Sequence, residues 1–368
     1  MEICLDGLCI THLTGTGLYT YAYELYNHLF RLYGQPNYHI IWDDSELVSS
    51  WEKNKKLTFE DIPINRIQND YRILETYLKG KNIQLYHSLH NGFSIPNKKV
   101  CPYITTVHDV SPFYKGYDID SKYENNFFRK FPNAMEKSDY IIAVSDFLKK
   151  QIVQQYPQVK NKVVTIYPGI GECFYETENQ TKNMEKTYLL HVGSMHTRKN
   201  IEKIMDVCEL IFKENKELKL LIVGKNDGKR EEDYLRLKYY AHQLNIQDHV
   251  VFTGEISYKN MVSIYRKSLF LFNFSKYEGF PFSALEALAC GVPVVCRKTD
   301  FMQEILKQSP IYVDENDPNK IKNKILELKN NQKEYKKISE EGRRFSQKYN
   351  WGHATKKIVQ IYEKAMYG

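Results

Sequence analysis

The sequence lacks any apolar run long enough to cross a membrane as a helix. Its longest apolar stretches, such as Tyr140–Val144 and Lys219–Gly224, are far shorter than the roughly 20 residues that a membrane-spanning helix requires. The first residues also lack a basic segment followed by an apolar one, so no secretory signal is visible. No Pro/Gly-rich or Ser-rich tract indicates disorder. These absences predict a folded protein that stays in the cytoplasm.

Cysteines are few and irregularly spaced. The seven cysteines, at positions 4, 9, 101, 173, 208, 290 and 296, form neither a Cys-x-x-Cys pair nor an even-numbered framework. Such spacing is typical of reduced thiols in the cytoplasm. We therefore expect no disulfide and no bound zinc.

The excess of one charge is also small. The formal net charge is +7: residues 1–168 hold 19 Lys and Arg against 18 Asp and Glu, and residues 169–368 hold 33 against 27. The surplus in the second half fits either an ordinary solvated surface or contact with an anionic ligand or an acidic lipid surface. No Lys/Arg cluster alternates with aromatic residues in a known binding motif, so nucleic acid is not an expected partner.

What the sequence does contain is a regular alternation of short apolar runs and amphipathic stretches. At 368 residues the chain is longer than one hydrophobic core normally supports. The alternation predicts an α/β fold in which helices cover both faces of parallel sheets, and the apolar runs form two series. The first series of predicted strands is Met1–Leu5, Tyr38–Trp42, Gln84–His87, Tyr103–His108, Tyr140–Val144 and Val163–Ile166; the second is Tyr188–Gly193, Leu218–Gly224, Val250–Gly254, Leu269–Phe274, Val292–Cys296 and Ile311–Val313.

The pattern is interrupted between the two series, at residues 167–171 (Tyr-Pro-Gly-Ile-Gly) and the polar run Glu176–Lys186. We place the domain boundary there, which gives a first domain over residues 1–168 and a second over residues 169–352. Helices are predicted at Ser145–Gln155, with Ser145 as the N-cap, and at Asn200–Lys213. A last helix, over about residues 353–368, returns to the first domain in this interpretation.

The most informative segment is Glu278–Val295, with the sequence Glu-Gly-Phe-Pro-Phe-Ser-Ala-Leu-Glu-Ala-Leu-Ala-Cys-Gly-Val-Pro-Val-Val. It follows an apolar run, so we expect a strand, a loop, a helix, a tight turn and a strand. Gly279 and Pro281 place Glu278 in the loop, whereas Glu286 lies inside an Ala-rich helix. The N-terminus of that helix, with its free N–H groups, then points into the crevice at the carboxyl ends of the strands.

This segment resembles the hallmark of the family 4 glycosyltransferases, two glutamates separated by seven residues in a strand–loop–helix setting. The resemblance implies the GT-B fold, in which two Rossmann-like domains face each other across a cleft, and a retaining transfer that needs no metal. It implies that Glu278 contacts the donor sugar and that Glu286 accepts hydrogen bonds from the ribose hydroxyls of the nucleotide. Pro281 stands where many relatives have a second glycine, which leaves the identity of the donor open. The other donor-binding residues that the resemblance implies here are Gly279, Phe280, Pro281 and Phe282.

A second segment, Leu189–Ile201, places a basic pair after a predicted strand. The strand ends in Gly193 and Ser194, and Arg198 and Lys199 precede an amphipathic helix. Arg can fork across two phosphate oxygens while Lys acts as a point charge, so the pair suits a nucleoside diphosphate leaving group. The family carries a similar Gly-x-x-x-x-Arg-Lys-Asn arrangement. This implies donor binding by Gly193 and by both cations, and a catalytic part for the cations.

A glycine-rich segment follows the first predicted strand and precedes a helix. Its sequence, Gly15-Thr16-Gly17-Leu18-Tyr19-Thr20, fails the Gly-x-Gly-x-x-Gly dinucleotide fingerprint because position 20 is Thr. It matches the glycine-rich acceptor-side loop of the family. The match implies that the backbone at Gly15 and Gly17 faces the donor phosphates and that Tyr19 lies on the acceptor side.

His108 and Asp109 emerge from the carboxyl end of the predicted strand Tyr103–His108. Polar residues at that end of a strand commonly line a crevice. The resemblance implies that His108 meets the transferred sugar as a catalytic residue. Asp109 either orients His108 or serves the acceptor.

A metal motif also occurs, because Asp118-Ile119-Asp120 spells the Asp-x-Asp with which another transferase fold holds a divalent ion. It lies in the polar stretch Lys115–Lys122 rather than at the end of a buried strand, so we interpret it as a solvated loop. We expect no metal and no cofactor. Arg198, Lys199 and helix N-termini supply the positive charge instead.

Together these patterns and the resemblance that they carry imply an enzyme that transfers a hexose (mannose, glucose or N-acetylglucosamine) from a GDP- or UDP-sugar to a glycan or lipid-linked acceptor hydroxyl. The expected setting is the assembly of a surface polysaccharide or glycolipid, with room for peripheral contact with the inner face of a membrane. Two alternatives share the architecture: a nucleotide-sugar 2-epimerase, which would need no acceptor, and a catalytically silent sugar-nucleotide-binding subunit. The complete set of Glu278, Glu286, Arg198, Lys199 and His108 argues against the silent subunit.

Overall fold

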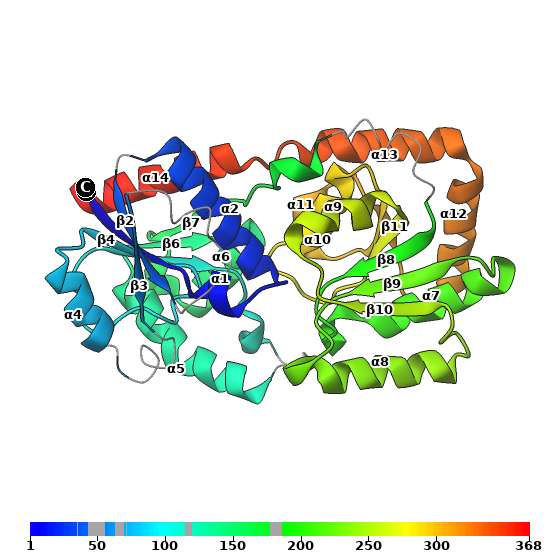
Figure 1. Cartoon of the computed structure of the whole chain (residues 1–368), viewed down its shortest axis with the longest axis horizontal. Helices are drawn as coiled ribbons and strands as arrows, with labels where there is room; N and C mark the ends of the chain where they lie inside the picture. Colours follow the sequence, from blue (N-terminus) through cyan, green and yellow to red (C-terminus); the bar gives the residue numbers. More distant parts are fainter. Residues whose placement is uncertain (35, 43–55, 63–69, 71, 115–119, 177–185) are drawn as a thin grey trace. The chain divides into compact units, whose positions relative to one another are not determined.

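The computed structural model describes residues 1–34, 36–42, 56–62, 70, 72–114, 120–176 and 186–368. The chain divides into two compact units, Met1–Gly169 together with Trp351–Gly368, and Ile170–Asn350 (Figure 1). Each unit is built from helices around one parallel sheet, which confirms the expected α/β architecture with two Rossmann-like domains. Most of the polar run Glu176–Lys186 lies outside the described residues.

The sheet of the first unit has seven strands in the order β3-β2-β1-β4-β5-β6-β7. Every neighbouring pair is parallel. The chain order reverses beside β1, so β1 and β4 flank the position where the carboxyl ends of a doubly wound sheet form a crevice. The strands are β1 (Glu2–Asp6), β2 (Asn37–Trp42), β3 (Leu57–Asp61), β4 (Leu85–Ser88), β5 (Tyr103–Val107), β6 (Tyr140–Ala143) and β7 (Val163–Thr165).

The first unit contains two helices that the sequence predicted, α6 and the last helix, α14. Helix α6 begins where expected, because the Ser145 hydroxyl accepts a hydrogen bond from the Leu148 amide at 3.2 Å. The last helix packs on this unit: the Tyr362 hydroxyl lies 2.7 Å from His87 Nδ1, and the Trp351 and Tyr21 rings are 5.1 Å apart. The helices are α1 (Leu8–His12), α2 (Gly17–Leu32), α4 (Arg72–Gly80), α5 (Ser121–Lys137), α6 (Asp146–Gln155) and α14 (Trp351–Tyr367).

The sheet of the second unit has six parallel strands in the order β10-β9-β8-β11-β12-β13. This is the same winding, with the reversal between β8 and β11. The strands are β8 (Tyr188–Val192), β9 (Lys219–Val223), β10 (Val250–Gly254), β11 (Ser268–Asn273), β12 (Val294–Arg297) and β13 (Ile311–Val313). The helices are α7 (Ile201–Glu214), α8 (Glu231–Gln243), α9 (Tyr258–Arg266), α10 (Phe282–Ala289), α11 (Asp300–Leu306), α12 (Pro318–Asn330) and α13 (Gln332–Ser346).

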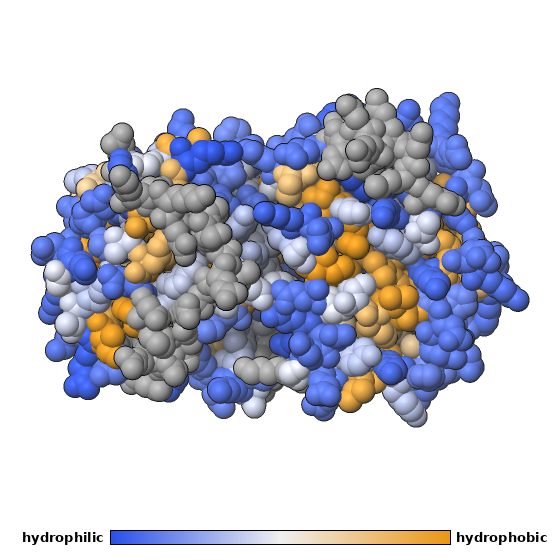
Figure 2. All heavy atoms as spheres, in the orientation of Figure 1, coloured by the Kyte–Doolittle hydropathy of each residue, from blue (hydrophilic) through white to orange (hydrophobic). Residues whose placement is uncertain are grey.

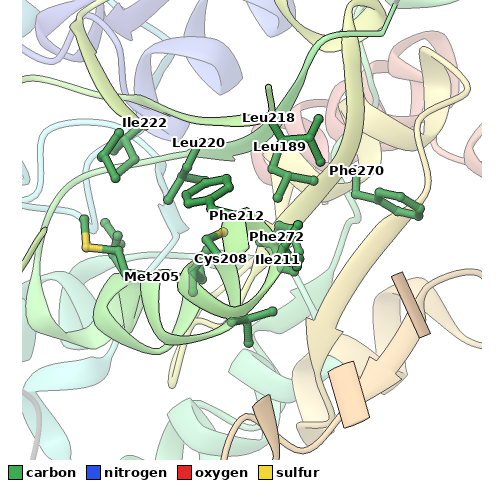
Figure 3. Packing of buried hydrophobic residues seen from close by; sticks show 14 of the residues in the cluster. Leu189, Met205, Cys208, Ile211, Phe212, Leu218, Leu220, Ile222, Phe270 and Phe272 are labelled. Carbon is green, nitrogen blue, oxygen red and sulfur yellow. The ribbon is translucent and has the colours of Figure 1, made fainter. Parts of the chain in front are cut away.

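The core of the second unit fixes the strands that carry the site. Helix α7 turns Cys208 and Ile211 toward Leu189 of β8, Leu220 of β9 and Phe270 of β11, all fully buried (Figure 3). A strand that is buried on both faces has a nearly continuous apolar sequence, as Leu269–Phe272 does. Dense packing of this kind allows little movement, so the loops after β8 and β11 start from fixed points.

The surface and the thiols add two observations. Hydrophilic residues predominate over the coloured part of the face drawn in Figure 2, with apolar patches between them. Within the described ranges, no helix is long and apolar enough to span a bilayer. All seven cysteines are free thiols.

Candidate functional site

The site residues of the second unit follow the two strands at which the sheet order reverses. Gly193, Arg198 and Lys199 come after β8, and Glu278 comes after β11. Because β8 and β11 pair in parallel, their carboxyl ends lie at the same edge of the sheet. The structure thus brings the basic pair and the first glutamate together from segments about 80 residues apart in sequence.

Gly193 shapes the backbone at the end of β8. Its φ is +154°, a conformation that other residues rarely adopt, and its amide donates to the Val223 carbonyl at 3.0 Å. A Cβ atom on the neighbouring Gly224 would lie 2.1 Å from the Gly193 carbonyl oxygen, so both strand ends require glycine. Gly224 was not among the predicted site residues, although it ends the predicted strand Leu218–Gly224.

Arg198 is held by the loop after β11. Residues Thr197–Lys199 form a short 3-10 turn that ends at Asn200, whose φ is +57°. The Arg198 Nη1 donates to the Tyr277 carbonyl at 2.9 Å, and the Lys276 amide donates to the Arg198 carbonyl at 2.8 Å. The first bond orients the guanidinium, and the second joins the backbone of Arg198 to the loop after β11.

Lys199 and Glu278 form a largely buried ion pair. The Lys199 Nζ lies 3.0 Å from Glu278 Oε1, and the two side chains are only 11% and 10% exposed. Asn273 Nδ2 also donates to Glu278 Oε1 at 3.1 Å. Burial alone would raise the pKa of Glu278, but the charge of Lys199, with smaller contributions that include the charge of Arg198, outweighs it and keeps the pKa below its usual range. Glu278 is therefore an anion at neutral pH.

The loop between Glu278 and α10 is packed rather than open. Gly279 is buried, and the Phe280 ring lies against Phe282 at 4.9 Å and against Tyr349 at 5.7 Å. Pro281 occupies the N-cap position of α10 without a side-chain cap, and its carbonyl accepts from the Leu285 amide at 3.2 Å. The first helical residue is Phe282.

Glu286 lies inside α10, as the sequence predicts, and its side chain has a fixed partner. The residue is 6% exposed, and the Tyr265 hydroxyl of α9 donates to Glu286 Oε2 at 2.7 Å. Burial and the Glu286 charge raise the pKa of Tyr265 well above its usual value, so Tyr265 remains a donor. Tyr265 was not a candidate from sequence, because a tyrosine 21 residues away carries no signal of this contact.

In the first unit, the glycine-rich segment forms the start of α2. Gly15 has φ +72°, Gly17 is the first helical residue, and Thr16 Oγ1 accepts from the Tyr19 amide at 3.3 Å. The Tyr19 ring stacks on Tyr23 with ring centres 5.7 Å apart. Gly17 therefore lies in the helix and not in a loop.

His108 follows β5 and carries a neutral ring. Its amide donates to Asn91 Oδ1 at 2.8 Å, and its ring meets the Tyr21 ring edge-on at 4.6 Å. Burial, with a smaller effect of His90, lowers the pKa of His108 to about 3 against the opposing hydrogen bond with the Leu89 backbone. Among the described residues, its Nε2 has no hydrogen-bond partner.

Asp109 stabilises a turn in the structure, which is neither of the two roles predicted for it. Its Oδ1 accepts from the Ser111 amide at 2.6 Å and so holds the turn that follows β5.

The second aspartate of the Asp-x-Asp motif caps a helix. Asp118 and Ile119 lie outside the described residues, but Asp120 is the N-cap of α5 and accepts from the Tyr123 amide at 2.8 Å. Asp120 is exposed and lies just before α5, and its carboxylate caps the helix by satisfying a free amide of the first turn. Over the described ranges, no three His, Cys, Asp or Glu side chains are close enough to share a metal ion.

Fold and site together define a GT-B glycosyltransferase. The model of the Glycosyltransferase Family 4 matches residues 57–171, and that of the Glycosyl transferases group 1 matches residues 176–345. The chain therefore belongs to the family 4 glycosyltransferases, which confirms the identification made from its motifs.

Individual relatives agree with this assignment. An uncharacterized glycosyltransferase of Methanocaldococcus jannaschii is 27% identical over 344 residues, which cover 89% of this chain and 90% of that protein. The O-antigen chain mannosyltransferase B of Escherichia coli is 23% identical over 297 residues, covering 77% and 73%. The structure of Anabaena HepE in complex with UDP-glucose superposes with a TM-score of 0.76 at 14% identity, over 99% of this chain and 100% of that one, and supports the fold.

Proposed function

We propose that this glycosyltransferase moves a hexose from a GDP- or UDP-sugar to a hydroxyl of a glycan or lipid-linked acceptor, with retention of the anomeric configuration and without a metal. The observation that carries the proposal is the Lys199–Glu278 ion pair beside the oriented Arg198, at the point where the sheet order reverses. Nucleotide ligands bind at this point in doubly wound sheets.

The charges suit the departure of a nucleoside diphosphate. As the bond to the sugar breaks, negative charge develops on the phosphate, and a guanidinium and an ammonium that are already in place stabilise it without rearrangement. In this proposal Glu278, an anion fixed by Lys199, accepts hydrogen bonds from hydroxyls of the donor sugar, and Glu286 accepts them from the ribose. The two cations do the electrostatic work that a metal does elsewhere.

The route to retention is a front-face reaction, in which the departing phosphate helps to deprotonate the acceptor. Glu278 then orients hydroxyls rather than attacks, because its charge is already paired with Lys199. The neutral His108 ring would meet the transferred sugar, with Tyr19 and Asp109 on the acceptor side.

Relatives suggest the range of donors and the setting. One is named as an O-antigen mannosyltransferase, and a solved structure of the same fold holds UDP-glucose. Mannose, glucose and N-acetylglucosamine therefore remain the sugars to test, in surface polysaccharide or glycolipid assembly. We further propose that the protein works in the cytoplasm, with peripheral contact to the inner face of a membrane.

The test is a panel of GDP- and UDP-sugars, assayed by calorimetry for binding and by product analysis for slow hydrolysis, with and without a chelator. We expect one nucleotide class to bind, and Glu286→Ala to weaken that binding about 10-fold or more, as for a lost hydrogen bond to a charged group. Glu334→Ala, which removes a partly exposed carboxylate from α13, is the matched control. If no sugar nucleotide binds, the proposed donor class is wrong. If a chelator abolishes the reaction, the proposed independence of a metal is wrong. A 2-epimerase would convert the donor alone.

A further inference from the structure

His191 is a buried polar residue in the centre of the site that has no role in the mechanism above. It lies on β8 two residues before Gly193, and it is 1% exposed. Its Nδ1 lies 3.1 Å from the Phe272 carbonyl oxygen of β11. The ring therefore spans the two strands at which the sheet order reverses.

The Phe272 contact fixes the tautomer of the ring. A carbonyl oxygen only accepts hydrogen bonds, so Nδ1 carries the proton. Burial, reinforced by the charge of Lys199, lowers the pKa of His191 to about 4, which keeps the ring neutral at physiological pH. In a neutral ring with the proton on Nδ1, Nε2 is an acceptor.

The acceptor atom, His191 Nε2, is buried and lacks a donor among the residues that the structure describes. Within the described part of the chain, His191 Nε2 has no hydrogen-bond partner although the atom is buried. Buried polar atoms without a partner are rare in folded proteins, and each needs an explanation.

The surroundings of Nε2 indicate what it faces. A Cβ atom at Gly193 would lie 3.6 Å from His191 Nε2, 3.5 Å from Lys199 Cε and 3.7 Å from Lys199 Nζ. The space on the open side of Gly193 is thus bordered by a neutral acceptor and by the ammonium that pairs with Glu278. Of the neighbours at this point, Lys199 has the long side chain that can turn.

We propose that His191 Nε2 accepts a hydrogen bond from a hydroxyl of the donor's hexose. The inference rests on the proposed function and adds a specificity-determining residue to it. A phosphate oxygen is itself an acceptor at neutral pH, so it cannot satisfy Nε2, whereas a sugar hydroxyl can. When the Lys199 ammonium turns toward the diphosphate, Nε2 and Glu278 are both uncovered on the sugar side.

The experiment compares ligands with and without the hexose. UDP against UDP-glucose and GDP against GDP-mannose are titrated calorimetrically into wild-type protein, His191→Leu and His191→Gln. We expect His191→Leu to bind the nucleotide sugar roughly 10-fold more weakly, the size of one hydrogen bond, and the nucleoside diphosphate unchanged. His191→Gln, whose amide oxygen places an acceptor near Nε2, restores most of the loss.

Two results would overturn the assignment: an equal loss for the sugar-free nucleotide, or no loss for either ligand. If His191→Leu fails to fold, the 15N signals of the wild-type ring decide, because the Nε2 signal should shift further with UDP-glucose than with UDP, and further with GDP-mannose than with GDP. No such difference rejects the inference. A wild-type protein that binds no sugar nucleotide rejects the proposed function first, and this inference with it.

Discussion

The two units share the same winding of a parallel sheet but carry different side chains at the carboxyl ends of their strands. In the second unit, the positions after β8 and β11 hold an oriented guanidinium and a buried ammonium–carboxylate pair. In the first unit, the corresponding edge holds a glycine-led helix start and the neutral ring of His108. The fold places residues at this edge, and the residue types decide whether the edge carries fixed charges or neutral groups.

The largest expected effect follows from breaking the charged pair. Lys199→Met leaves the Glu278 carboxylate buried without its cation, which should cost about 3 kcal/mol in free energy of unfolding. The same change should lower the transfer rate about 100-fold, because a positioned charge is lost. Thermal denaturation and a transfer assay measure the two effects.

A second variant separates stability from activity. Lys199→Met with Glu278→Gln should recover most of the stability, since no unpaired charge remains, but none of the rate. Lys213→Met, which breaks the exposed pair with Glu209, should change stability by less than about 0.5 kcal/mol. Because the pKa of Glu278 is lowered, the contribution of the pair is present above the ordinary carboxyl pKa and is lost as the pH falls through the lowered value. Equal stability of Lys199→Met and wild type would contradict this account.

The next prediction concerns the contribution of the Arg198 guanidinium to turnover. Arg198→Ala should reduce turnover about 10- to 100-fold, because it removes a cation that is already aimed by the Tyr277 carbonyl. Arg129→Ala on the exposed side of α5 removes an arginine from the first unit and should leave turnover unchanged. Steady-state kinetics on both variants measure the difference. Equal losses of turnover in Arg198→Ala and Arg129→Ala would show that the prediction is wrong.

A smaller effect tests the neutral character of the first unit. With its pKa near 3, His108 should remain uncharged between about pH 5 and 8, so it should add no inflection to the rate profile there. His108→Ala should lower the rate about 10-fold with an unchanged profile, as expected for one lost hydrogen bond. An inflection near the ordinary histidine pKa of about 6.5 that disappears in His108→Ala would show that the ring is charged.

The smallest effect concerns the Asp-x-Asp motif. Asp120→Ala should lower the free energy of unfolding by about 1 kcal/mol, as for a lost N-cap. It should leave the transfer rate, and the response of that rate to a chelator, unchanged. Ser145→Ala, which removes the cap of α6, is the matched control with a similar cost. Loss of activity in Asp120→Ala alone would indicate a metal role that the first unit is not expected to have.

Local sequence signals predicted much of the fold. Apolar runs located the strands to within one or two residues, and Ser145 capped its helix as expected, because both signals depend on near neighbours. The edge strand β3 was missed, since Leu57–Asp61 is short and half polar and pairs on one side only. Helix α1 was also missed, as five residues carry too little periodicity.

The candidate site was predictable as a set of residues but not as a set of contacts. Glycine and proline placed Glu278 in a loop, and the motif identified Lys199, but their pairing depends on β8 lying beside β11. His191 was overlooked because a single histidine within an apolar strand resembles a core residue. Only the Phe272 carbonyl on the neighbouring strand reveals its tautomer.

The most direct measurement is the structure of crystals soaked with UDP-glucose and with GDP-mannose. This account predicts electron density for a diphosphate within hydrogen-bond distance of Arg198 and Lys199, with the ribose hydroxyls on Glu286. Density in another part of the second unit, with residues 198, 199 and 286 unchanged, would contradict it.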